Sequence, residues 1–184
     1  MKFTDLRLDP RILEGIDAMG YENATPVQQQ VMVPILEGKD IIAAAQTGTG
    51  KTAAFVLPIL QKLKPSAPNN EGRVKALILA PTRELVQQIE ESVLKYSKHL
   101  DLRVASAFGG VDIRHQIEAT KHGVDILVAT PGRLLDLHTQ EKISFTGLKY
   151  LVLDEADRML ALGFYAVIKE IISYLPTWRQ SLLF

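Results

Sequence analysis

Short apolar runs alternate along this chain with longer segments in which apolar residues recur every three or four positions. An apolar run of about four to eight residues between polar or Gly/Pro signals is typical of a buried strand, whereas the longer period is typical of a helix with one buried face. The runs predict strands at residues 41–44, 74–80, 104–108, 125–129, 150–153 and 181–184.

Helix start signals precede the periodic segments. Asp9-Pro10 and Thr25-Pro26 each pair a capping side chain with a proline suited to the first helical turn. Residues 3–8 are predicted to form an extended lead-in, and residues 64–73 a polar surface loop. Helices are predicted at residues 10–19, 27–36, from 53 onward, from 81 onward, 112–120, 131–138 and 167–174.

Repeated alternation of strands and helices predicts the α/β class, with a parallel sheet and helices on both of its faces. Ligands of such sheets bind at the carboxyl ends of the strands. Ala45, Pro81, Gly109, Thr130 and Asp154 each follow a predicted strand directly, so we expect these five positions to share one edge of the sheet.

Composition limits the partners that the protein can have. The 184 residues suit one domain with a sizeable core, and 47% hydrophobic with 23% charged residues is ordinary for a soluble globular chain. Because the formal net charge is +0, nucleic acid would have to bind at a local site and not over a basic face. The absence of cysteine and of any membrane-length apolar run agrees with a cytoplasmic protein that does not span a membrane.

Residues 45–52, Ala-Gln-Thr-Gly-Thr-Gly-Lys-Thr, lie between a predicted strand and a predicted helix. A phosphate-binding P-loop requires this context, because backbone N–H groups of the turn and helix start converge where the helix dipole favours negative charge. Lys51 can reach the β- and γ-phosphates of a nucleotide, and the Thr52 hydroxyl can ligate Mg²⁺. Ala45 departs from the usual initial glycine, and an ordinary turn with an exposed lysine is the alternative. The phosphate-binding residues predicted are Thr47, Gly48, Thr49, Gly50, Lys51 and Thr52.

A P-loop needs an acidic partner for Mg²⁺, and Asp154 follows a four-residue apolar strand where that partner usually lies. The adjacent Glu155 can act as the base that polarises an attacking water. We therefore predict that Lys51, Asp154 and Glu155 are catalytic. The alternative is that the carboxylates only favour the start of a helix.

The P-loop together with Asp154-Glu155-Ala156-Asp157 resembles the DEAD-box ATP-dependent RNA helicases, in which the P-loop typically begins with Ala. Within that family the resemblance is to bacterial RhlE-like members. It covers essentially the whole chain and implies a RecA-like P-loop NTPase domain that uses ATP and Mg²⁺. Residues 1–38 should then form N-terminal helices that carry the Q motif of this domain, and residues 39–184 its RecA-like ATP-binding part.

The same resemblance implies roles for further segments. Gln28, within Thr25-Pro26-Val27-Gln28, corresponds to the residue that reads the adenine edge, and Phe3 and Tyr21 to aromatic residues of the same motif. Ala24 stands where many members have Pro. The residues that the resemblance places on the RNA path are Pro81, Thr82, Arg83, Gly109, Gly110, Thr130, Pro131, Gly132 and Arg133. Because phosphate contacts carry no sequence information, RNA binding should be largely non-specific.

Members of this family continue with a Ser-Ala-Thr segment and a second RecA-like domain, which supplies arginine fingers and half of the RNA surface. The resemblance therefore implies that this chain is the first half of a helicase, that it is a monomer, and that it is nearly inactive by itself.

Three alternatives stay open at this level. One is a DNA helicase or translocase of the same superfamily, and another is a non-catalytic binding module. The third is a GTPase-like switch, which the missing Asn/Thr-Lys-x-Asp segment disfavours, since Gly123 stands at the Asp position after Thr120-Lys121.

Several other side chains are not predicted to take part in catalysis or ligand binding. The four histidines (His99, His115, His122 and His138) are interpreted as surface residues. Trp178 is interpreted as local packing, and Met159, Leu160, Leu162 and Phe164 as core.

Overall fold

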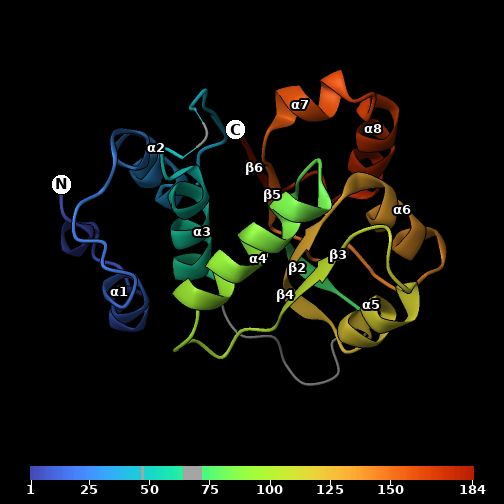
Figure 1. Ribbon diagram of the computed structural model, residues 1–184, viewed down its shortest axis with the longest axis horizontal. Coiled ribbons are helices and arrows are strands. Elements are labelled where there is room, and N and C mark those ends of the chain that lie inside the picture. The colour runs from blue at the N-terminus through green and yellow to red at the C-terminus, as the bar shows by residue number, and fades with distance from the viewer. Residues whose placement is uncertain (47, 64–71) are drawn as a thin grey trace.

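A computed structural model describes residues 1–46, 48–63 and 72–184 (Figure 1). Six strands form one sheet in the order β1-β6-β5-β2-β4-β3, and every neighbouring pair is parallel. The strands are β1 (Ile41–Ile42), β2 (Val74–Leu79), β3 (Val104–Ala107), β4 (Val124–Ala129), β5 (Tyr150–Leu153) and β6 (Gln180–Leu183). The predicted α/β class is confirmed.

Helices cover both faces of this sheet. The 3₁₀ helix η1 and helices α1 to α3 gather on one side, α4 crosses in front of the sheet, and α5, α6 and α8 lie on the opposite side (Figure 1). They are η1 (Phe3–Leu6), α1 (Pro10–Asp17), α2 (Pro26–Leu36), α3 (Lys51–Lys62), α4 (Arg83–Tyr96), α5 (Ile113–Thr120), α6 (Pro131–Thr139), α7 (Ala156–Ala161) and α8 (Tyr165–Tyr174).

The central strands bury both of their faces. In β2, Ala76 and Ile78 belong to the core shared with α1 to α4, whereas Leu77 and Leu79 belong to the core shared with α6 and α8. Successive strand residues point to opposite faces, so a continuous apolar run is needed where helices cover both. This requirement explains why the central strands appear in the sequence as mainly apolar runs.

Several predicted helix starts are confirmed by their caps. The side chains of Asp9 and Asp112 accept hydrogen bonds from the N–H groups two residues later, both at 2.9 Å. The Thr82 hydroxyl accepts a bond from Leu85 N–H at 3.3 Å. These bonds satisfy amide groups that the first helical turn cannot pair, and so define where each helix begins.

Some local predictions are wrong. Residues 3–8 are not extended: Phe3–Leu6 forms a 3₁₀ helix that buries the Phe3 ring, which is 4% exposed. Helix α7 was not predicted as a separate element. Of the residues interpreted as core, Met159 is buried, whereas Leu160 and Leu162 are 53% and 55% exposed. A six-residue helix can turn only one narrow stripe toward the core.

Two aromatic side chains also differ from their interpretation. Trp178 is 94% exposed and therefore not local packing. His138 is not simply a surface residue, because its ring lies 5.0 Å from that of Phe145 and 4.4 Å from that of Tyr174. The contact between His138 and Tyr174 joins residues that are far apart in the sequence. Of the predicted loop at 64–73, residues 64–71 lie outside the described part of the structure.

Across residues 1–46, 48–63 and 72–184, no helix has the length and apolar character needed to cross a membrane.

We predict that Gly15→Ala destabilises the protein by about 1–3 kcal/mol, although Ala is the better helix former. A Cβ on Gly15 would lie 2.8 Å from the backbone oxygen of Tyr96, where α1 approaches the end of α4. Urea unfolding followed by circular dichroism measures the change. Asp17→Ala, at an exposed position of the same helix, is the control and should change stability by less than about 0.5 kcal/mol. Equal stabilities for the Gly15→Ala and unsubstituted proteins would show that the two helices separate without cost.

Candidate active site

The strand order divides the predicted site segments into two groups at one edge of the sheet. The P-loop follows β1 and Asp154 follows β5, so the nucleotide segments lie in the half formed by β1, β6 and β5. Pro81, Gly109 and Thr130 follow β2, β3 and β4, which are adjacent in the other half. The prediction that all five segments share one edge is confirmed.

The P-loop connects a very short strand to a long helix. Ala43 N–H still pairs with Leu183 O at 2.9 Å, and the chain then leaves the sheet. Gly50 precedes α3 with a φ of 86°, and Gly48 has a φ of 82°, both in the left-handed region that favours glycine. Lys51 is consequently the first residue of α3. Thr47, predicted as a phosphate contact, lies outside the described residues.

Gln28 joins the first helices to the P-loop. Its Nε2 donates to Gly50 O at 3.0 Å, and its Oε1 accepts from Thr25 N–H at 2.9 Å. A carboxamide has two N–H groups and two lone pairs, so one donor and one acceptor remain for a ligand. A Cβ on Gly50 would lie 2.5 Å from Nε2, so only glycine leaves room for this bond.

A cavity of about 460 Å³ connects these parts. Its walls include Phe3, Tyr21 and Gln28 from the predicted adenine motif, Gly50, Lys51 and Thr52 from the P-loop, and Asp154 and Glu155. Phe3 is nearly buried whereas Tyr21 is 51% exposed, so Tyr21 offers the more accessible ring. The structure therefore brings together the three groups that the sequence placed far apart.

Helix α4 supplies cavity residues that the sequence analysis missed. Leu85, Gln88, Ser92 and Tyr96 line the cavity, and their spacing of three and four places them on one side of the helix. That spacing was the only available signal, and it does not reveal what the side faces. Burial raises the pKa of Tyr96 to about 12.

Asp154 and Glu155 occupy different environments although they are adjacent. Asp154 is 3% exposed, and its pKa is raised to about 6 chiefly by burial, against the opposing charge of Lys51. Glu155 has a φ of 54° and a ψ of 49°, an uncommon conformation for a residue with a side chain. Its Oε2 pairs with Arg158 Nη1 at 3.1 Å. Such strained backbone at a cavity wall is typical of functional positions.

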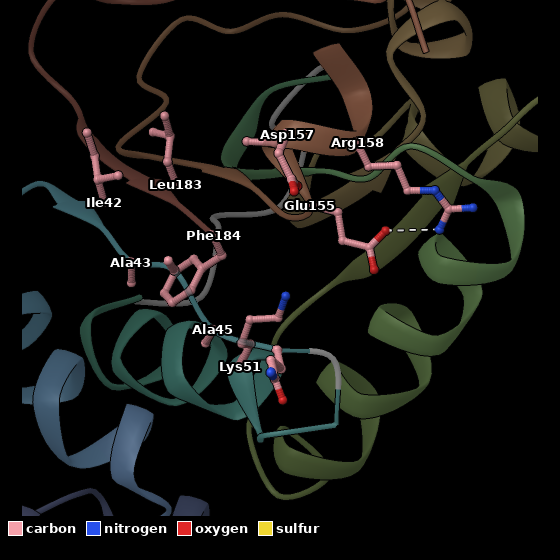
Figure 2. A pocket seen from close by; sticks show the side chains of 12 residues that line it. Ile42, Ala43, Ala45, Lys51, Glu155, Asp157, Arg158, Leu183 and Phe184 are labelled. Atoms are coloured by element: carbon pink, nitrogen blue, oxygen red, sulfur yellow. Dashed lines mark hydrogen bonds and ion pairs between the residues drawn. The ribbon is translucent and has the colours of Figure 1, made fainter. Parts of the chain in front are cut away.

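Lys51 and Glu155 also line a second hollow of about 870 Å³, which borders Ala43 to Gln46 at the start of the P-loop. Figure 2 shows Lys51 extending from the start of α3 into this hollow, with the Glu155–Arg158 ion pair across from it. Phe184 and Leu183 close the wall beside β1. The arrangement puts a cation and a carboxylate on opposite sides of one space.

The donor set suits Mg²⁺ bound together with phosphates. Mg²⁺ usually keeps several waters and takes only one or two carboxylates plus phosphate oxygens. The buried Asp154 carboxylate and the Thr52 hydroxyl line the same cavity, and so meet that requirement. In the ranges that the structure describes, no group of three or more His, Cys, Asp or Glu side chains could hold a metal ion by itself.

The other half of the edge carries the residues predicted for RNA. Exposed Arg83 lies over the Phe108 ring, with its guanidinium carbon 5.0 Å from the ring centroid. The Thr130 hydroxyl makes no capping bond to α6, and a Cβ on Gly132 would meet open space. Gly110, with a φ of 82°, is exposed like Gly109.

Arg133 has its guanidinium turned into the protein. Its Nη1 donates to Gln116 Oε1 at 2.8 Å and its Nη2 to Val111 O at 3.1 Å, and the side chain is 12% exposed. Its backbone N–H lies in the first turn of α6 and has no intrahelical acceptor. The backbone of Arg133 is thus better placed than its side chain to meet a ligand.

The DEAD/DEAH box helicase family profile matches residues 25–184. The chain is 47% identical to the ATP-dependent RNA helicase CshA of Limosilactobacillus reuteri, over 100% of this chain and 36% of the relative. It is 43% identical to the DEAD-box ATP-dependent RNA helicase CshA of Bacillus subtilis (strain 168), over 99% of this chain and 36% of the relative. The DEAD-box ATP-dependent RNA helicase RhpA of Helicobacter pylori (strain B128) is 42% identical over the same shares.

A solved structure described as a hypothetical ATP-dependent RNA helicase from Sulfolobus tokodaii is similar with a TM-score of 0.86. Its sequence is 36% identical, over 96% of this chain and 50% of that chain. The chain thus spans about a third of the length of these curated relatives, for which the covered share is 36%. Because these relatives are named CshA and RhpA, the RhlE-like subtype stays a prediction.

We predict that Asp154→Asn stabilises the ligand-free protein at neutral pH. With a pKa raised from 3.8 to about 6 in the folded state, the acid form contributes stability below pH 4 that is lost as pH rises to about 6. The neutral amide avoids that loss. The expected gain is about 2–3 kcal/mol at pH 7.5 and about 1 kcal/mol at pH 4.5.

Urea unfolding of both proteins at the two pH values checks this prediction. Asp157→Asn, at an exposed position of the same helix start, is the control and should show no pH-dependent gain. A gain of equal size at pH 7.5 and 4.5 would show that packing and not the buried charge is responsible.

Proposed function

Because this chain belongs to the DEAD/DEAH box helicase family, we propose that it is the ATP-binding domain of a protein that couples ATP hydrolysis to unwinding or remodelling of RNA. The observation that carries this proposal is the shared edge of the sheet. The cavity formed by Gln28, Gly50 and Asp154 lies at the same edge as exposed Arg83 and Gly110 and half-buried Thr130. Its two halves meet at the adjacent strands β5 and β2.

The nucleotide end of the site selects adenine and holds phosphates. The remaining donor and acceptor of the Gln28 carboxamide match the amine and ring nitrogen of an adenine edge. The glycine turn leaves its N–H groups open to the phosphates, and Lys51 supplies a positive charge opposite them. Since Gln28 is bonded to Gly50, base binding and the conformation of the phosphate turn are coupled.

The catalytic part of the site holds and activates water. Glu155 lies opposite Lys51 and is oriented by the ion pair with Arg158, so it is placed to accept the proton of a water that attacks the γ-phosphate. Mg²⁺, when bound by Asp154, Thr52 and the phosphates, supplies the charge that polarises the phosphoryl group. The backbone strain at Glu155 serves to aim its carboxylate.

The other half of the edge binds the RNA backbone. The hydroxyls of Thr82 and Thr130 can donate to phosphate oxygens, and the N–H groups of Gly132 and Arg133 begin α6, where the helix dipole also favours an anion. Exposed Arg83 adds a positive charge. These contacts read phosphate and sugar, so the bound sequence should matter little.

A second RecA-like domain completes both activities in this proposal. An arginine finger stabilises the phosphoryl transition state by about 10³–10⁵ in rate, and Arg133 is bonded within the protein. With the 870 Å³ hollow open on one side, water would not be excluded from the γ-phosphate. The isolated chain should therefore bind ADP but turn over ATP slowly. A monomeric state and a cytoplasmic location belong to the same proposal.

We predict that this chain binds ADP at least about tenfold more tightly than GDP, because guanine presents an acceptor where adenine presents its amine. Isothermal titration with each nucleotide and Mg²⁺ measures the ratio. Gln28→Ala should reduce it toward one, whereas Gln30→Ala, at an exposed position of the same helix, should leave it unchanged. Equal affinities for ADP and GDP in the unsubstituted chain would contradict the adenine-reading role.

We predict that Glu155→Gln, in a protein that joins this domain to its second RecA-like domain, keeps ATP binding but lowers RNA-stimulated phosphate release by about 10²-fold or more. The amide preserves the shape of the side chain and cannot accept the proton. Phosphate release with saturating RNA and then with DNA of the same sequence measures both the residue's role and the polymer preference. Normal turnover by Glu155→Gln would refute the base assignment, and equal stimulation by DNA would refute the RNA assignment.

A further inference from the structure

We infer that Gln116 is a positioning residue that holds the glycine turn at residues 108–111 in the conformation presented to RNA. This inference rests on the proposed function, since it concerns the surface proposed to bind phosphates. Gln116 lies in α5 and is 6% exposed, and both ends of its carboxamide are bonded within the protein. Its side chain connects two segments of that surface.

The carboxamide of Gln116 uses both of its ends. Nε2 donates to Phe108 O at 3.0 Å, at the start of the turn, and Oε1 accepts from Arg133 Nη1 at 2.8 Å. The amide orientation is determined by these partners, because a carbonyl accepts and a guanidinium only donates. Breaking either bond would leave a polar group inside the protein without a partner, which would reduce stability. The two bonds are therefore expected to form and break together.

Arg133 continues the connection to the other end of the turn. Its Nη2 donates to Val111 O at 3.1 Å, so the pair Gln116–Arg133 binds the backbone carbonyls on both sides of Gly109 and Gly110. Neither glycine has a side chain that could hold the turn, and Gly110 has a φ of 82° that few other residues adopt. The conformation of the turn therefore depends on side chains from α5 and α6.

The turn held by Gln116 and Arg133 also contacts the segment that follows β2, which is the third segment predicted to bind RNA. The guanidinium carbon of Arg83 lies 5.0 Å from the centroid of the Phe108 ring, whose backbone oxygen Gln116 holds. The segments after β3 and β4 are thus joined by one buried glutamine, and the segment after β2 contacts them at the Phe108 ring. A surface held in its binding conformation avoids the entropy cost of ordering a glycine turn when the ligand arrives.

The test compares three substitutions with a charge-matched control. Gln116→Met keeps the approximate volume and removes both bonds, Gln116→Glu keeps only the bond to Arg133, and Arg133→Lys keeps the charge but cannot reach both acceptors. Gln140→Glu, an exposed position at the end of α6 away from the carboxyl edge, introduces the same charge change as Gln116→Glu. If the Met variant does not fold, the other two still decide the question.

Three quantities are measured for the 184-residue chain: amide hydrogen exchange of residues 108–111, the dissociation constant of a single-stranded oligouridine, and that of ADP. Exchange should accelerate about tenfold or more in the three variants, and RNA affinity should fall about tenfold, because the turn must be ordered on binding. ADP affinity should stay within about twofold, since the nucleotide lies in the other half of the edge. The control should change none of the three.

Unchanged exchange in the three variants would overturn the inference, and so would faster exchange without loss of RNA affinity. Failure of the unsubstituted chain, with or without its second domain, to bind oligouridine would refute the proposed function instead. In that case the exchange measurement still decides whether Gln116 holds the turn. Parallel losses of ADP affinity and of RNA affinity would indicate general destabilisation, and would also overturn the positioning role.

Discussion

The parallel register of the sheet is the constraint on which the whole site depends. Leu79 of β2 pairs with Ala129 of β4 and with Leu153 of β5. In the next strands outward, Ala107 of β3 pairs with Ala129, and Leu183 of β6 pairs with Leu153. The strands therefore end together, and every segment that follows them emerges at one edge. A shift of one residue in a strand would exchange its two faces between the two cores, so the apolar packing enforces the alignment that the chemistry needs.

Two buried glutamines attach helices to this edge, one in each half. Gln28 donates to Gly50 O beside the phosphate turn, and Gln116 donates to Phe108 O beside the turn at Gly109. In one case the carboxamide holds the carbonyl of a glycine and in the other the carbonyl before a glycine, where the glycine has no side chain to do so. The conformational freedom that lets a backbone approach phosphates must be restricted from elsewhere in the fold, and buried amides do this without adding charge.

The nucleotide half also contains features that reduce stability. Asp154 is a carboxylate held in an apolar environment, with a pKa raised to about 6, and its neighbour Glu155 has a left-handed backbone. Neither feature benefits the fold, and both are placed where a cation and phosphates would be bound. A ligand that supplies positive charge beside Asp154 would remove part of the penalty, so ligand binding and stability should be coupled.

The sequence by itself determined most of the helices and strands, and it predicted where a nucleotide would bind. The apolar runs, the caps at Asp9 and Asp112, and the strand–turn–helix context of Lys51 are all short-range signals, which act within a few residues. Only the tertiary structure decided the strand order, the inward orientation of the Arg133 guanidinium and the exposure of Trp178. Periodicity shows that one face of an element is buried, but the partner of that face comes from distant residues, and no local pattern encodes it.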